Sequence, residues 1–245
     1  MIFEMHCHTS EHSACSHIDA LSLVRRIHEK GFEGIVLTDH HYLWTPPELQ
    51  ELRRRAGVPQ FFMILAGQEV STSDAGHVLV YGAGRTLEEG TSLADIRKEF
   101  PQAALVSSHP YRSGSVPSPQ RLLDPLLDAV EIFSSNHTVS ELSRALTDWH
   151  RYKFTAIGGT DAHSLSYAGM YPTLFDHPIA SIDDLASELK AGRCGPFFKE
   201  IPKAGTTATR VLELTMGAKG DDDAREKLIV KRHENAEAWK SGART

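Results

Sequence analysis

The chain has 245 residues, of which 40% are hydrophobic and 24% charged, and its formal net charge is −6. This length suits one large domain with a sizeable core, and the composition is that of an ordinary globular protein. The acidic balance and the lack of a basic stripe argue against tight binding of a nucleic-acid backbone.

The N-terminal residues and the cysteines bear on where the protein works. The first residues show neither the basic start nor the apolar stretch of a signal peptide, and no apolar run approaches the length that spans a bilayer. The three cysteines, Cys7, Cys15 and Cys194, contain no C-x-x-C pair. This pattern indicates neither a disulfide scaffold nor a zinc ribbon, so we expect a cytoplasmic protein without membrane association.

Strand and helix patterns alternate in the first half of the chain. We predict a strand over 1–6, a helix over 20–31, a strand over 32–40, a helix over 46–57, and strands over 61–72 and 77–84. The strand over 32–40 carries the buried run Ile35, Val36 and Leu37 and then a polar end. Gly31 is the expected end of the first helix.

The alternation continues in the second half. We predict a helix over 93–100, a strand over 103–110, a helix over 118–128 interrupted by Pro125, a strand over 129–133, a helix over 139–152, a strand over 154–163, and a helix over 181–193 capped by Ser181. Strands that alternate with such helices indicate βα units and a mostly parallel sheet. A last strand is predicted over 209–216, followed by a charged helix or tail from about 218.

Ligand-type side chains gather at the ends of the predicted strands. They are His6 and His8, Asp39 and His40, Glu69, His109, and Asp161 and His163, while His77 is an exception because it opens a strand. The carboxyl ends of parallel strands meet on one face of a barrel, which is where barrel enzymes carry out their chemistry. We therefore expect these side chains to converge.

The residue types and spacing point to metal ions. His6 and His8 are two residues apart, so both imidazoles can reach one ion from an extended strand, and Asp161 and His163 repeat this spacing. Imidazoles and carboxylates together suit Zn, Mn or Fe rather than Ca. The ligands exceed the needs of one ion, which predicts two or three ions bridged by a carboxylate such as Glu69. A single H-x-H pair is weak support, and Asp39 could be only a hydrogen-bonded strand end.

Seven motifs, in their order and spacing, resemble one known family over residues 2–198. They are HCHTSEHSACS at 6–16, LTDHH at 37–41, GQEVS at 67–71, HVLVYG at 77–82, SSHPYR at 107–112, VEIF at 130–133 and GGTDAHS at 158–164. The family is the PHP (polymerase and histidinol phosphatase) superfamily of metal-dependent phosphoesterases. Residues 170–197 also resemble the extension that follows the last motif in many stand-alone members.

The resemblance implies an α/β fold, a distorted (β/α)7 TIM-like barrel with a short C-terminal extension. We expect residues 1–200 to form this single domain, and residues 201–245 to add a last strand and a polar helix or tail.

The resemblance also implies two or three divalent ions, Mn, Fe or Zn. By its motifs, His6, His8, Glu69 and Asp161 would hold the first ion; Glu69, His77 and His109 the second; and His40 and His163 the third. One further ligand of the third ion would come from the loop after His8, where His12, Cys15 and His17 are all candidates.

The expected activity is hydrolysis of a phosphate ester. A hydroxide bridging the first two ions would attack phosphorus, and Arg112 would neutralise the charge of the phosphate. His40 or His163 would protonate the leaving group, a role that competes with metal binding. The expected partner is a small phosphorylated substrate, with no stable nucleic-acid complex. The sequence does not indicate an oligomeric state.

Three alternatives belong to other functional classes. A 5′–3′ exonuclease or oligonucleotide phosphodiesterase would use the same metals, and a basic channel would support it. An amidohydrolase acting on C–N bonds would usually need a bridging lysine at a strand end, where the sequence has none. A non-catalytic metal-binding module predicts a degenerate ligand set.

Six loop residues are candidates for the mouth of the site. Four are aromatic and could either stack on a substrate or only pack the loops: Tyr42, Trp44, Tyr111 and Tyr167. The other two, Asn136 and His137, could line the mouth.

Overall fold

A computed structural model describes residues 1–197, which form a mixed α/β structure around one sheet of nine strands. The strands are β1 (Ile2–Glu4), β2 (Gly34–Leu37), β3 (Met63–Thr72), β4 (Gly76–Tyr81), β5 (Ala104–Ser107), β6 (Ala129–Phe133), β7 (Ala156–Gly158), β8 (Thr173–Phe175) and β9 (Cys194–Pro196). Their order in the sheet is β7-β6-β5-β4-β3-β2-β1-β8-β9. The strand predicted over 209–216 and the tail that follows lie outside the described residues.

The middle of the sheet departs from the predicted parallel arrangement. β1, β2 and β3 run parallel, as do β5, β6 and β7, but β4 is antiparallel to both β3 and β5. Only residues 73–75 join β3 to β4, and a parallel crossover needs a dozen residues or more. The start of β4 therefore lies at the edge where the neighbouring strands end, and His77 pairs with Ser71 of β3.

The sheet curves into a nearly closed barrel. Just after β1 and β7, Cys7 and Ala162 form a parallel bridge, and the Asp161 amide donates to the His6 carbonyl at 2.8 Å. At the far edge β8 pairs antiparallel with β1 and β9 pairs antiparallel with β8, and β9 contacts β7. The predicted distorted α/β barrel is confirmed.

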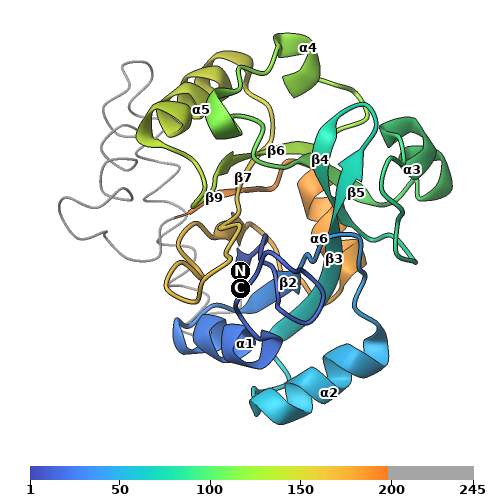
Figure 1. Ribbon diagram of the computed structural model, residues 1–245, viewed down its shortest axis with the longest axis vertical. Helices are drawn as coiled ribbons and strands as arrows, with labels where there is room; N and C mark the ends of the chain where they lie inside the picture. Colours follow the sequence, from blue (N-terminus) through green and yellow to red (C-terminus); the bar gives the residue numbers. More distant parts are fainter. Residues whose placement is uncertain (198–245) are drawn as a thin grey trace.

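Helices surround the strands, as Figure 1 shows for α1, α2, α3 and α5. The helices are α1 (Ala20–Glu29), α2 (Pro46–Ala56), α3 (Leu93–Glu99), α4 (Pro119–Leu122), α5 (Val139–Tyr152) and α6 (Ile182–Lys190), with a short 3-10 helix η1 (Arg112–Gly114). Ser181 caps α6 as predicted. α4 is shorter than the predicted helix over 118–128, because Pro125 disfavours a helical backbone at the residue before it.

The core is divided by the alternation of side chains along the strands. Inward-facing residues such as Phe3, Val36 and Leu79 pack with Leu185 and Leu189 of α6 in one cluster. α6 contacts β4 and β5, and Ala186 approaches Gly82, which follows the end of β4. Because β4 runs in the opposite direction to its neighbours, this contact places α6 at the end of the barrel away from His77.

The outward faces of the strands are covered by the other helices. α1 and α2 pack over β1 and β2, α3 packs over β3, β4 and β5, and α5 packs over β6. The carboxyl ends of the parallel strands are therefore left for loops, which is the arrangement that places side chains at one mouth of a barrel. None of the helices within residues 1–197 has the length and apolar character needed to cross a membrane.

Candidate metal centre

All eight predicted metal ligands meet at one mouth of the barrel. They form three overlapping groups whose ligand atoms lie within 4.8 Å of one another: His6, His8, Glu69 and Asp161; Glu69, His77 and His109; and His8, His40 and His163. The antiparallel direction of β4 explains why His77, which opens its strand, joins residues that end theirs. The predicted convergence is therefore observed.

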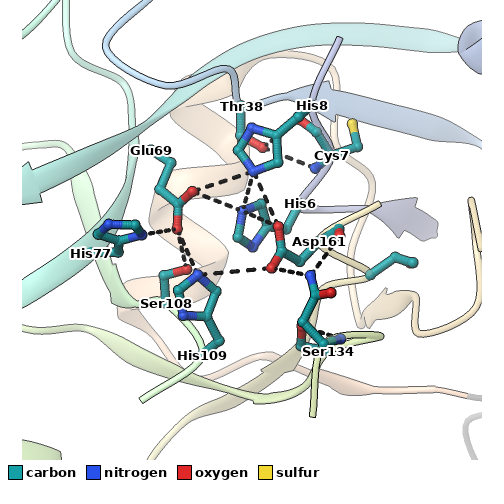
Figure 2. A network of polar contacts seen from close by, with 12 residues as sticks. His6, Cys7, His8, Thr38, Glu69, His77, Ser108, His109, Ser134 and Asp161 are labelled. Carbon is teal, nitrogen blue, oxygen red and sulfur yellow. Dashed lines mark hydrogen bonds and ion pairs between the residues drawn. The ribbon is translucent and has the colours of Figure 1, made fainter. Parts of the chain in front are cut away.

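The first group is completely buried. His6 Nε2 lies 3.1 Å from His8 Nε2 and 3.4 Å from Glu69 Oε2. Asp161 Oδ1 lies 3.1 Å from His8 Nε2 and 3.5 Å from His6 Nε2. Two nitrogens and two carboxylate oxygens therefore face one small volume (Figure 2).

The second group uses the other oxygen of Glu69. Glu69 Oε1 lies 3.2 Å from His77 Nδ1 and 3.0 Å from His109 Nε2. Figure 2 shows the carboxylate between these two rings on one side and His8, His6 and Asp161 on the other. Each oxygen of Glu69 therefore faces a different group, as in a carboxylate that bridges two ions.

The donor set fits divalent ions by its spacing. Donors about 2.0–2.2 Å from an ion are about 2.8 Å apart in octahedral and about 3.6 Å apart in tetrahedral coordination. The contacts from Glu69 and Asp161 to the histidines of the first two groups, at 3.0–3.5 Å, fall in this range. The spacing of these donors therefore fits a divalent ion.

Two buried atoms in these groups support the same fit. Within the described part of the chain, Glu69 Oε2 and His109 Nε2 have no hydrogen-bond partner. His109 Nε2 is 3.0 Å from Glu69 Oε1, yet the two atoms do not meet with the direction of a hydrogen bond. Buried polar atoms without partners are costly, and coordination of a cation would satisfy both.

The third group contains only imidazoles. His8 stacks on His40 with ring centroids 4.4 Å apart, and His163 lies 4.7 Å from His8. The structure does not bring the predicted extra ligand to this group: His12 stacks on Tyr42, and neither Cys15 nor His17 is within reach among the described residues. The third group is therefore the weakest of the three as an ion site.

The charge of the centre favours cations. Burial lowers the pKa of His6, but the carboxylates of Glu131, Asp161 and Glu69 outweigh it and hold this pKa well above its usual value. Burial raises the pKa of Asp161 and of Glu69, yet the positive charge on His6 and the hydrogen bonds from neighbouring histidines bring both far below their ordinary range. Both carboxylates are therefore ionised at neutral pH, the form that binds metal.

His40 and His163 differ from His6 in their protonation. Burial and the neighbouring His8 lower the pKa of His40 to about 4. Burial also lowers the pKa of His163, against the opposing effect of Asp161. Both rings are neutral at pH 7, which suits a metal ligand better than a proton donor.

Two further side chains approach Asp161 from the mouth. Asn136 Nδ2 donates to Asp161 Oδ2 at 2.6 Å, which leaves Oδ1 for the first group. The predicted Arg112 lies with Nη1 3.8 Å from the same Oδ2, and its side chain is 45% exposed. Arg112 therefore lies beside the site with its side chain partly exposed.

Backbone strain is concentrated at the centre. Asp161 has φ 51°, His109 φ 28° and His41 φ 48°, in the left-handed region that costs a non-glycine residue free energy. Such strain persists where surrounding contacts fix it, and it is typical of functional sites.

Other predicted residues have structural roles. Asp39 accepts hydrogen bonds from Thr9, Ser13 and the Trp44 indole, so it organises the loop after His8 and belongs to none of the ligand groups. Tyr111 is fully buried and donates to Asp148, so it packs the loop. Tyr167 is exposed and Tyr42 half-buried.

Two buried glutamates beneath the centre were not predicted to take part in the site. Glu4 accepts hydrogen bonds from the backbone amides of His6 and Thr160 and so ties the end of β1 to the end of β7. Glu131 accepts a hydrogen bond from His6 Nδ1 at 2.9 Å. The signal in the sequence is a carboxylate inside an otherwise apolar strand, IFE and AVEIF.

Comparisons with known proteins place this geometry in context. A family model described as PHP-associated matches residues 140–194, which run from α5 to β9. No curated protein sequence matches the chain.

Solved structures share the fold at low identity. PsfC from Pseudomonas syringae PB-5123 is 15% identical, with a TM-score of 0.61 and 93% of this chain and 98% of PsfC covered. A two-domain protein from Bacteroides vulgatus ATCC 8482, described as containing a PHP-like metal-dependent phosphoesterase, is 15% identical, with a TM-score of 0.60 over 81% of this chain and 64% of its own.

A third similar structure is that of an endonuclease. The lesion-specific endonuclease PfuEndoQ from Pyrococcus furiosus is 13% identical, with a TM-score of 0.52 over 87% of this chain and 72% of its own. The resemblance predicted from the motifs is confirmed at the level of the fold: the barrel is similar to those of these proteins, and residues 140–194 match the PHP-associated family model.

Proposed function

We propose that the protein is a metal-dependent phosphoesterase that hydrolyses a phosphate ester of a small molecule. The observation that carries this proposal is the position of Glu69, whose two oxygens face two different groups of ligands. A carboxylate shared in this way would hold two ions side by side, and a pair of divalent ions supplies the chemistry of in-line displacement at phosphorus.

Different residues of the chain would hold each of the two ions. His6, His8 and Asp161 would hold one ion, His77 and His109 the other, and Glu69 both. Bound divalent ions supply the chemistry of lowering the pKa of a water molecule and offsetting negative charge on the phosphoryl group. His40 and His163, neutral and partly exposed beside the first group, would face the substrate or a weaker third ion.

Arg112 would bind the phosphate. Its guanidinium stands at the rim of the first group, and five N–H donors in a planar fork match the oxygens of a phosphate. Because it is exposed, its contribution would appear when substrate binds and would add little to the stability of the free protein.

The charge of the chain supports a small substrate. A net charge of −6 without a basic stripe gives a weak field for a long polyanion. Because the fold is shared with an endonuclease, DNA belongs in the test as a competing substrate.

The test is a hydrolysis screen on purified protein loaded with Mn, Zn or Fe(II). The substrates are p-nitrophenyl phosphate, bis-p-nitrophenyl phosphate, nucleotides, sugar phosphates and a 5′-phosphorylated duplex with an abasic site. Asp161→Asn should abolish hydrolysis, because an amide replaces the anionic oxygen of the first group. Asp128→Asn is the matched control, since Asp128 bonds Leu105 and Arg97 and touches no ligand.

The outcomes are distinct. Metal-dependent turnover of small esters that disappears in Asp161→Asn and survives in Asp128→Asn supports the proposal. Turnover of the duplex alone would replace it with a nuclease. Full activity in Asp161→Asn, or activity without metal, would refute the site.

A further inference from the structure

Glu131 is a buried carboxylate to which the proposed mechanism gives no part. It lies in the middle of β6, where every residue is buried, and its own exposure is 0%. A charge in such a position is retained only when its oxygens are hydrogen-bonded. Its partners are therefore informative.

One oxygen of Glu131 bonds to the first ligand group. His6 Nδ1 lies 2.9 Å from Glu131 Oε1, and as the carboxylate can only accept, the imidazole proton is on Nδ1. In the neutral ring, the form that binds a metal, Nε2 of His6 then carries the lone pair, and this is the nitrogen that faces His8, Glu69 and Asp161. Glu131 thus sets the tautomer of His6 that can bind a metal.

The other oxygen bonds to the second group. Glu131 Oε2 accepts the backbone amide of His109 at 2.7 Å and lies 3.4 Å from Ser108 Oγ. Ser108 Oγ also donates to Glu69 Oε1 at 2.6 Å. His109 has the strained φ of 28°, so the bond to its amide helps hold the turn that directs its ring to Glu69.

The carboxylate of Glu131 is tightly packed. A Cβ added to Gly159, in the turn after β7, would lie 2.1 Å from Glu131 Oε1 and 2.8 Å from the Cβ of His6. A glycine at this position therefore lets the carboxylate reach His6.

We propose that Glu131 is a positioning residue that couples the two metal-binding groups, by fixing the tautomer of His6 through one oxygen and the orientation of His109 through the other. The inference rests on the proposed function, because it assigns Glu131 a role toward ions that the first two groups would hold.

Glu131→Gln tests this coupling with almost no change in volume. The amide offers one acceptor where the carboxylate offers two. If its oxygen faces His6, the NH₂ group opposes the donor of His109. If the oxygen faces His109, the NH₂ group favours a lone pair on His6 Nδ1, which moves the proton to Nε2 and blocks the metal.

The experiment measures zinc affinity by competition with a chromogenic chelator and the visible spectrum of the Co(II)-loaded protein. Glu131→Gln should weaken zinc binding about 10- to 100-fold, the usual effect of losing a partner that orients a ligand. Its Co(II) spectrum should also differ from that of the wild type. Asp128→Asn is again the control, since it removes a similar carboxylate, just before β6, that accepts a hydrogen bond from a β5 amide.

The control separates positioning from a general loss of structure. Asp128→Asn should lower the melting temperature while zinc affinity and the Co(II) spectrum stay unchanged. Equal losses of zinc affinity in both variants, or wild-type affinity and spectrum in Glu131→Gln, would overturn the proposal. If Glu131→Gln does not fold, Gly159→Ala presses on the same carboxylate and should give the same loss; unchanged affinity there would count equally against it.

The proposed function can fail separately. Wild-type protein that binds zinc but hydrolyses no phosphate ester would refute the phosphoesterase and leave the role of Glu131 toward the metal intact. Hydrolysis by the wild type, together with unchanged zinc affinity and Co(II) spectrum in Glu131→Gln, would support the phosphoesterase and refute the role of Glu131.

Discussion

The replacement Gly159→Ala places a methyl group between the two parts of the metal centre. The new Cβ would lie 2.1 Å from Glu131 Oε1 and 2.8 Å from His6 Cβ, whereas ordinary contacts are about 3.4–4 Å. The carboxylate or the turn must therefore move by about 1.3 Å. β6 is buried along its whole length, which leaves Glu131 no open side to which it could turn.

The cost follows from what the movement breaks. Withdrawal of Glu131 would break its hydrogen bonds to His6 Nδ1 and to the His109 amide. Overpacking in a rigid core costs about 1–3 kcal/mol, and each lost hydrogen bond to a charged group costs about 1.5–3 kcal/mol. Partial relaxation makes about 3 kcal/mol the reasonable expectation, which lowers the melting temperature of a domain of this size by about 6–12 °C.

The assay has two readouts on the same preparations. Thermal unfolding of the metal-free protein reports the steric cost, and zinc titration against a chelator reports the displacement of His6. Gly84→Ala is the matched control, because its Cβ would meet only Phe100 Cε1 at 3.7 Å, an ordinary contact. A Gly159→Ala protein that melts within about 2 °C of the wild type and binds zinc equally well would refute the packing described around Glu131.

Three further predictions concern the metals and the substrate. Zinc at about 100 times its dissociation constant should raise the free energy of unfolding by about 2.7 kcal/mol, because the groups are assembled only in the folded chain. Metal analysis should find two tightly bound ions, since the third group has only imidazoles and shares His8 with the first; three tight equivalents would contradict this. Arg112→Ala should raise KM for a phosphate ester with a smaller effect on kcat, and the melting temperature should not change. An unchanged KM in steady-state kinetics would remove Arg112 from substrate binding.

Much of the barrel was predictable because local periodicity records which face of each element is buried. The predicted helices over 20–31, 139–152 and 181–193 agree with α1, α5 and α6 to within a few residues at each end. The spacing of His6 and His8 also predicts their convergence, since neighbouring positions on one side of an extended chain reach the same volume.

The direction of β4 was decided by tertiary structure. The sequence shows a strand after a short loop, and the alternation of strands and helices suggested parallel neighbours. The three-residue connection instead makes a hairpin, which carries His77 to the edge where β3 and β5 place Glu69 and His109. A histidine at the start of a strand, such as His77, can be placed among the ligands only once the antiparallel direction of β4 is known.

The sequence by itself determined the alternating strands and helices, the acidic character of the chain and the set of imidazoles and carboxylates able to meet at strand ends. Only the tertiary structure decided that Glu69 turns one oxygen to each group, that Asp39 organises a loop, and that Glu131 reaches His6. The physical reason is that periodicity describes burial one element at a time. Hydrogen bonds between elements depend on how the closing barrel brings together residues as far apart as His6 and Asp161.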